Sequence, residues 1–185
     1  SQLILTYGAT VIGVEPNHEM REAGDTFLAK YPEFRSVNGS AESTGLADAS
    51  IDIITAGQAF HWFQRQPTRQ EFQRILKPQG WVALIWNVRH TDTSPFLNEY
   101  EDFLKTYAID YEQVNHKQVD DEVISEFFAP SPCQSYRFPH QQTVGFSGLR
   151  GRLESSSYTP TPAHPRYKEM IEQLKILFER HQHNN

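Results

Sequence analysis

A single cysteine, Cys133, occurs among the 185 residues, so the sequence excludes an internal disulfide bond and favours a reducing, cytoplasmic location. No apolar run approaches the roughly 20 residues that cross a bilayer, and no basic-then-apolar segment opens the sequence. Basic residues are also scarce: the net charge is −6, and Lys and Arg do not cluster. The sequence therefore argues against a membrane protein and against a general binder of nucleic acids or anionic membranes.

Hydrophobic residues make up only 38% of the sequence, which is low for an α/β domain whose central strands are nearly all apolar. Residues 1–7 carry no helix start signal but end at Gly8, a typical C-terminal cap, so they resemble the tail of a helix. The length predicts one domain with a sizeable core. We hypothesise that the sequence is a fragment, or covers only the ordered part of a longer polypeptide, and that some buried strands lie outside it.

The most informative stretch spans residues 10–21. Val11, Ile12 and Val14 form an apolar run typical of a buried parallel strand, and Gly13 inside it indicates a close backbone approach. The run ends at Glu15, and a helix start follows, with Asn17 as its expected N-cap. A carboxylate at the tip of a parallel strand stands where open α/β sheets bind ligands, and in nucleotide-binding versions it accepts hydrogen bonds from ribose hydroxyls. The alternative is that Glu15 only ends the strand and faces solvent.

Strands and helices alternate through the first half of the sequence. We expect strands at 10–15, 34–38, 51–56 and 81–86, helices at 17–31 and 67–76, turns at 39–42 and 77–80, and a loop at 57–63. Short connections in this order predict an α/β fold: a doubly wound, Rossmann-like, mostly parallel sheet with helices on both faces.

The pattern changes after residue 87. Helices are expected at 96–107, 119–128, 146–153 and 167–181, with an edge strand at 135–138. We therefore predict three parts. Residues 1–87 form a core that is incomplete at its N-terminus, and residues 88–152 form a mostly helical lid with an edge strand over the substrate pocket. Residues 153–185 form a loop and a C-terminal helix that packs on the core.

Four short motifs follow one another in the first half: GVEPNHEM at 13–20, GSAE at 39–42, AFHWF at 59–63 and LKPQG at 76–80. In this order and spacing they resemble the class I S-adenosylmethionine-dependent methyltransferases, within the small-molecule branch of the type 11/25-like enzymes. The resemblance covers residues 1 to about 87, and RLESSSYTP at 152–160 is similar to a tract of one subgroup. It implies an enzyme that methylates the oxygen, carbon or carboxyl group of a small molecule.

The resemblance also implies how the cofactor, S-adenosylmethionine, is bound and S-adenosylhomocysteine released. Glu15 would bind the ribose hydroxyls, and Met20 would pack its thioether on the adenine ring. The Ala41 backbone N–H and the Glu42 carboxylate would read the adenine edge, although a loop acid near a helix start is an alternative for Glu42. The complete cofactor set is Glu15, Pro16, Asn17, Met20, Ser40, Ala41, Glu42, Gln58, Ala59 and Phe60, the last three beside the methionine part.

The acceptor would be bound at the same edge. His61 could act as a general base for an acceptor that carries a proton, or it could hold the loop structurally. Trp62 would form a pocket wall. Arg89, Arg150 and Arg152 could clamp a carboxylate, or could be surface arginines of the lid. The predicted substrate-binding set is His61, Trp62, Trp86, Asn87, Arg89, Arg152 and Tyr158; no histidine has metal-ligand spacing, so we expect no metal.

Two elements of the family are missing from the sequence: the first strand with its Gly-rich loop, and the closing C-terminal strands. Without the glycine loop, an NAD-dependent dehydrogenase is an alternative, because it too places an acid after its second strand; however, a Tyr-x-x-x-Lys pair is absent. A third hypothesis is a non-catalytic relative that binds cofactor or a partner protein. As an enzyme, the chain would act as a monomer or homodimer.

Overall fold

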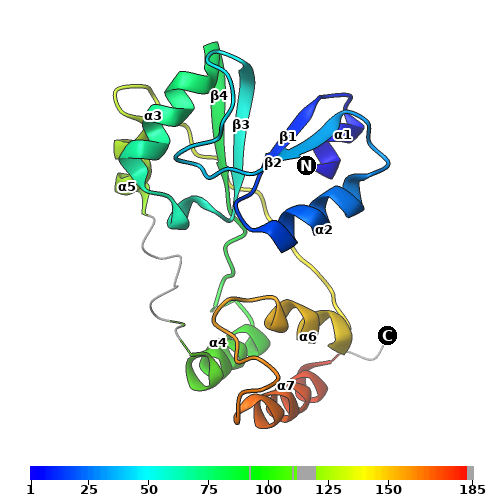
Figure 1. Ribbon diagram of the computed structural model, residues 1–185. Coiled ribbons are helices and arrows are strands. Elements are labelled where there is room, and N and C mark those ends of the chain that lie inside the picture. Colours follow the sequence, from blue (N-terminus) through cyan, green and yellow to red (C-terminus); the bar gives the residue numbers. More distant parts are fainter. Residues whose placement is uncertain (92, 110, 112–119, 183–185) are drawn as a thin grey trace. The chain divides into compact units, whose positions relative to one another are not determined.

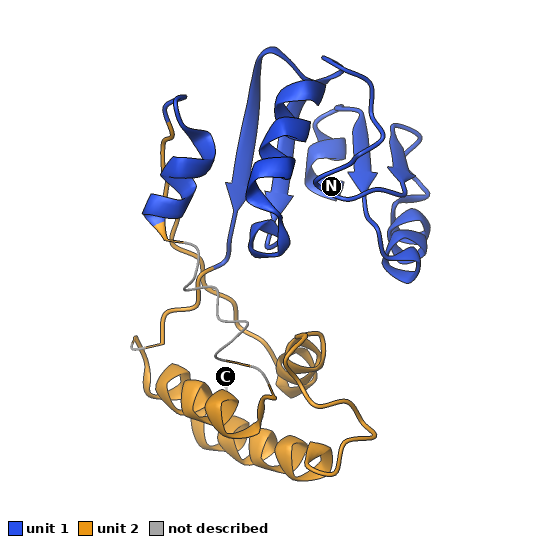
Figure 2. Cartoon of the chain, turned by 60° about the vertical axis from the view of Figure 1, so that its left-hand side comes forward, with its two compact units in different colours: residues 1–87, 121–132 blue, residues 88–120, 133–185 orange. Residues whose placement is uncertain are grey.

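The computed structural model describes residues 1–182 except 92, 110 and 112–119. The chain forms two compact units (Figure 2): unit 1 comprises residues 1–87 and 121–132, and unit 2 comprises residues 88–120 and 133–185. Residues 121–132 thus group with the strands, and residues 153–185 group with the helices of unit 2.

Unit 1 begins with α1 (Gln2–Thr6), which ends before Gly8 at a φ of +80°. It continues with β1 (Val11–Val14), α2 (His18–Leu28) and β2 (Phe34–Val37). β1 and β2 are parallel, with Val11 opposite Phe34. The predicted close approach at Gly13 is confirmed: a Cβ there would lie 3.2 Å from the Phe34 ring, which fills the space.

The second half of unit 1 contains β3 (Ile51–Gly57), the 3₁₀ turn η1 (Phe60–Trp62), α3 (Arg65–Ile75) and β4 (Leu76–Ile85). The expected turn at 77–80 lies inside β4 instead of before it. β3 pairs with β4 on both sides of this stretch: Ile51 lies opposite Leu76 and Ile53 opposite Trp81, so the intervening residues form an irregularity in one continuous strand.

The described strands form two separate two-stranded parallel sheets, β1–β2 and β3–β4 (Figure 1). The α/β class and the parallel pairing agree with the prediction. The single doubly wound sheet does not appear among the described residues, because no backbone ladder joins the two strand pairs.

Helix α5 (Asp121–Phe128) was expected in the lid but packs against α3 in unit 1. The reason is Phe127, which is 6% exposed and lies between two other buried rings. Its ring centroid is 4.8 Å from that of Phe60 and 6.2 Å from that of Phe72, both in edge-to-face geometry. Residue 119, the expected start of this helix, lies outside the described residues.

Unit 2 contains α4 (Pro95–Tyr107), α6 (Phe146–Glu154) and α7 (Tyr167–His181). Residues of all three helices form its core: Tyr100, Phe103, Leu104, Leu149, Leu153, Met170, Leu174 and Leu177. The C-terminal helix has the predicted bounds, and within unit 2 it contacts α4 and α6. The expected edge strand at 135–138 is wrong: Tyr136 and Phe138 are 71% and 83% exposed, and the segment has no strand partner among the described residues.

Candidate functional site

At the tip of β1, Glu15 follows the strand and Asn17 is the N-cap of the next helix, as the sequence predicts. The Glu15 carboxylate oxygen Oε1 accepts a hydrogen bond from the Asn17 N–H at 2.8 Å. Asn17 caps α2, because its Oδ1 accepts the Met20 N–H at 3.0 Å. Arg21 donates from Nη1 to the Glu15 carbonyl oxygen at 2.9 Å. The half-buried carboxylate is therefore held at the strand end, and Met20 beside it is 64% exposed.

The loop after β2 carries Ser40, Ala41 and Glu42. Ser40 and Ser43 exchange two backbone hydrogen bonds, of 3.1 and 3.2 Å. Glu42 Oε1 accepts the N–H of Gln64, the N-cap residue of α3, at 2.9 Å and the hydroxyl of Thr68, within α3, at 3.4 Å. Burial raises the pKa of Glu42, but these hydrogen bonds and one from Ser40 outweigh it, so the pKa lies below its ordinary value. Glu42 thus caps α3 as an ionised carboxylate.

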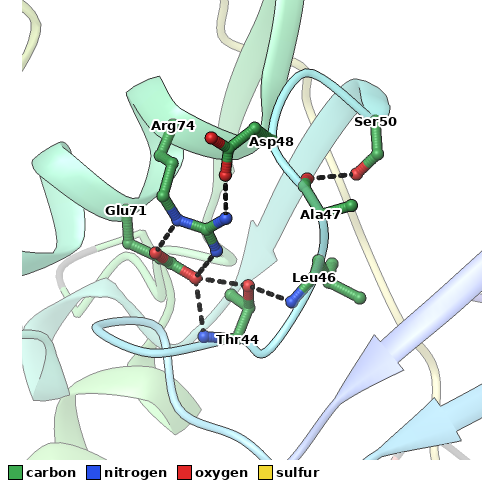
Figure 3. Close-up of polar contacts among 7 residues, drawn as sticks. All are labelled: Thr44, Leu46, Ala47, Asp48, Ser50, Glu71 and Arg74. Atoms are coloured by element: carbon green, nitrogen blue, oxygen red, sulfur yellow. Dashed lines mark hydrogen bonds and ion pairs between the residues drawn. The ribbon is translucent and has the colours of Figure 1, made fainter.

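A second carboxylate joins the same loop to α3 and was not singled out from the sequence (Figure 3). Glu71 Oε1 accepts both the Thr44 N–H at 2.8 Å and the Thr44 hydroxyl at 2.5 Å. Arg74 donates to both Glu71 oxygens at 2.8 Å and to Asp48 at 2.5 Å. The hydrogen bond from Arg74, with those from Thr44, lowers the pKa of Glu71 to about 2. The Glu-x-x-Arg spacing on one helix face was the available signal.

The tip of β3 is joined to the chain that leaves β4. Gln58 has a φ of +54°, in the left-handed region that is uncommon for a side-chain-bearing residue. Its backbone N–H donates to the Ile85 carbonyl at 2.9 Å, and its Nε2 donates to the Asn87 carbonyl at 3.2 Å. The structure therefore brings Gln58, a predicted cofactor residue, together with Asn87, a predicted acceptor residue.

In η1, Phe60 lies in the core and Trp62 lies at the surface. Phe60 is 2% exposed and packs edge-to-face on Trp86 at 6.0 Å, so it belongs to the core. His61 is half-buried, with its ring 4.9 Å from that of Trp62, which is 64% exposed. Of the predicted acceptor residues, Trp86 therefore packs on Phe60, and His61 and Trp62 follow Phe60 in η1 with their rings close together.

The remaining acceptor residues lie in unit 2. Arg89 Nη2 donates to Glu101 Oε2 at 2.6 Å and to the Tyr111 hydroxyl at 2.7 Å. Tyr111 donates in turn to Glu101 Oε2 at 2.6 Å, and its ring meets that of Tyr158 at 5.1 Å. Burial, followed by the hydrogen bond to Glu101, raises the pKa of Tyr111 to about 12. Arg89 and Tyr158 therefore share one polar cluster.

The other two arginines have separate partners. Arg152 is exposed and donates to the Gln142 side chain, and Arg150 pairs with Glu154 at 2.9 Å. Across the residues that the structure describes, no group of three or more His, Cys, Asp or Glu side chains could hold a metal ion. Within the same residues, none of the helices has the length and apolarity needed to cross a membrane.

Parts of the chain are similar to known methyltransferase sequences. Residues 1–84 match the family described as "Methyltransferase domain". An uncharacterized methyltransferase-like protein of Schizosaccharomyces pombe is 33% identical over 59% of this chain and 41% of its own length. An uncharacterized methyltransferase of the same yeast is 38% identical over 48% of this chain and 34% of its own length. The chain thus spans less than half the length of these relatives.

Among solved structures, a protein of Anaeromyxobacter dehalogenans described as a "Putative Type II Methyltransferase" matches 93% of this chain and 72% of its own, with a TM-score of 0.58 and 20% identity. This similarity concerns the fold alone. The sequence match and the four motifs agree on the same segment of the chain. Residues 1–84 are therefore similar to methyltransferase domains, the family that the four motifs of the same segment resemble.

Proposed function

We propose that the protein transfers a methyl group from S-adenosylmethionine to a small-molecule acceptor. The observation that carries this proposal is the Glu15 carboxylate, held at the C-terminal tip of a parallel strand by the N–H of Asn17 at 2.8 Å. An acid in this place is the usual acceptor for the ribose hydroxyls of a nucleotide cofactor. The match of residues 1–84 to methyltransferase domains supports this cofactor over a dinucleotide.

We expect the side chains that follow β1 and β2 to bind the adenosine half of the cofactor. Glu15 would accept the two ribose hydroxyls, with Pro16 and Asn17 beside it, and the exposed Met20 would pack on the base. Ser40 and Ala41 would meet the adenine edge. Glu42 would take part from a fixed position, because its Oε1 accepts the N–H of Gln64, the N-cap residue of α3. Gln58, Ala59 and the Phe60 backbone would follow beside the methionine part.

When bound, S-adenosylmethionine supplies an electrophilic methyl group, which an acceptor nucleophile attacks in line with the departing sulfur. The protein has to align the acceptor and exclude water. Trp62 and Trp86 would shield the reacting groups, and His61 would take the proton on an imidazole nitrogen where the acceptor carries one. Asn87, Arg89, Arg152 and Tyr158 are the other residues that we expect to contribute to acceptor binding.

Calorimetric titration with S-adenosylhomocysteine tests the cofactor site, with NAD as the comparison ligand. We expect micromolar binding of S-adenosylhomocysteine and at least tenfold weaker binding by Glu15→Gln, which keeps an acceptor for the Asn17 N–H but loses the charge. Glu33→Gln, an exposed acid of the same unit, is the matched control and should bind like the wild type. NAD binding that exceeds S-adenosylhomocysteine binding would refute the proposal, as would equal effects of the two variants.

A further inference from the structure

Hydrogen bonds join the loop at 39–48 to helix α3, and each of the two elements supplies a carboxylate that accepts them. From the loop, Glu42 accepts hydrogen bonds from Gln64 and Thr68 of α3. From the helix, Glu71 accepts two hydrogen bonds from Thr44, which lies 27 residues earlier in the sequence. Each element thus contributes a carboxylate that binds the other, and neither can shift without breaking hydrogen bonds to a charged group.

The Glu71 contacts lie in a protected environment. Thr44 is 4% exposed, Thr68 is 0% exposed and Glu71 is 9% exposed. Glu71 receives two hydrogen bonds from Thr44 and two from the Arg74 fork (Figure 3). A carboxylate with this many donors is fully occupied by the protein, so its contribution is to hold the loop rather than to bind a ligand.

Contacts within the loop connect Thr44 to Ser40 and Ala41. Ser40 and Ser43 are joined by the two backbone hydrogen bonds already described. A Cβ on Gly39 would lie 3.0 Å from both the Ser43 and the Thr44 carbonyl oxygens, so the start of the loop is folded tightly onto its end. Fixing Thr44 therefore fixes residues 39–43 as one piece.

We infer that Thr44 and Glu71 are positioning residues, through which α3 holds the loop in the conformation that recognises the purine base of the cofactor. The inference rests on the proposed function, because Ser40 and Ala41 are the residues expected at the adenine edge. It goes beyond that function by assigning base selectivity to a hydrogen-bonded pair that need not touch the ligand.

The test compares two ligands that differ only at the base. S-adenosylhomocysteine carries an exocyclic amino group on the purine, and S-inosylhomocysteine carries a carbonyl oxygen there. We expect the wild type to prefer the adenosine compound. Thr44→Val, which removes the hydroxyl with little change of shape, and Glu71→Gln should each reduce that preference by about tenfold, the effect of one hydrogen bond. Thr44→Ser should restore it, and Thr161→Val, at an exposed threonine, should leave it unchanged.

A loss of stability alone would weaken both ligands by the same factor, so an unchanged preference in both variants would overturn the inference. Amide hydrogen exchange gives a second readout that needs no ligand: Ser40 and Ser43 should exchange about tenfold faster in Thr44→Val, relative to amides of β3, and equal protection would also overturn the inference. A wild type that binds neither compound would refute the proposed function and this inference with it. A wild type that binds while the variants keep its preference would refute the inference alone.

Discussion

Arg89 and Glu101 form a salt bridge of 2.6 Å in unit 2, with the Tyr111 hydroxyl bonded to both side chains. Glu101 is 7% exposed, and the Arg89 guanidinium also lies 5.2 Å from the centre of the Tyr100 ring. Burial raises the pKa of Glu101, but the hydrogen bonds from Tyr111 and Arg89 bring it below the ordinary value. A carboxylate acceptor that binds Arg89 must therefore share it with Glu101.

Replacing Glu101 should destabilise unit 2 because it leaves Arg89 without its buried counter-charge. For Glu101→Gln we expect a loss of about 3 kcal/mol in the free energy of unfolding. Asp102→Asn is the control: Asp102 is 79% exposed and 3.7 Å from Lys105, so this change should have no measurable effect. Urea denaturation of both variants measures the difference, and similar stabilities would contradict the prediction.

The Glu71 contacts should make stability depend on pH in the acid range. The pKa of Glu71 falls from 4.5 to about 2 on folding, so its stabilisation is complete above pH 4.5 and is lost as the pH falls toward 2. The shift corresponds to about 3 kcal/mol. The wild type should therefore exceed Glu71→Gln in stability at pH 6, and the two should converge near pH 2. A constant difference across this range would show that the Glu71 charge is not involved.

The assignment of α5 to unit 1 can be tested at Phe127. Truncation to alanine should cost about 3–4 kcal/mol, because the ring is buried against Phe60 and Phe72. Phe138→Ala, at a ring that is 83% exposed, should be neutral. Thermal unfolding followed at the tryptophans of unit 1 measures both. A neutral Phe127→Ala would mean that this helix does not belong to that core.

The irregular stretch of β4 should tolerate only glycine at residue 80. A Cβ there would lie 2.8 Å from Leu76 Cδ2 and 3.0 Å from the Asp52 and Lys77 carbonyl oxygens. Gly80→Ala should therefore destabilise the protein by about 1–3 kcal/mol through overpacking. Gly57→Ala provides the comparison in the neighbouring strand, since nothing lies within 4 Å of its Cβ position. Chemical denaturation would contradict this reasoning if Gly57→Ala were the more damaging change.

Local patterns predicted most elements correctly. Helix α7 was expected at its observed bounds because Met170, Leu174 and Leu177 recur at helical spacing, and all three are buried. The N-cap at Asn17 was found for a similar reason, since its hydrogen bond reaches only three residues along the chain. Such features depend on residues that are close in sequence, so they can be predicted from the sequence alone.

The features that escaped prediction depend on distant residues. The helical period of α5 was visible, but the sequence could not show that Phe127 packs on Phe60, 67 residues away, rather than in a lid. The Thr44–Glu71 contact likewise joins residues 27 apart. Phe60 was assigned to the cofactor from its motif, but it lies in the core because three aromatic rings converge on it. The individual roles of the candidate site residues remain predictions.

The two-way attachment between α3 and the loop at 39–48 has a consequence for protein engineering. A chimera that took this loop from a relative would bring in residues whose partners, Thr68, Glu71 and Arg74, stay behind on the host helix. Arg69 of the same helix also donates to the Ala129 carbonyl at the end of α5. The loop and the helix should therefore be exchanged together, and a recombination crossover should not fall between the two elements.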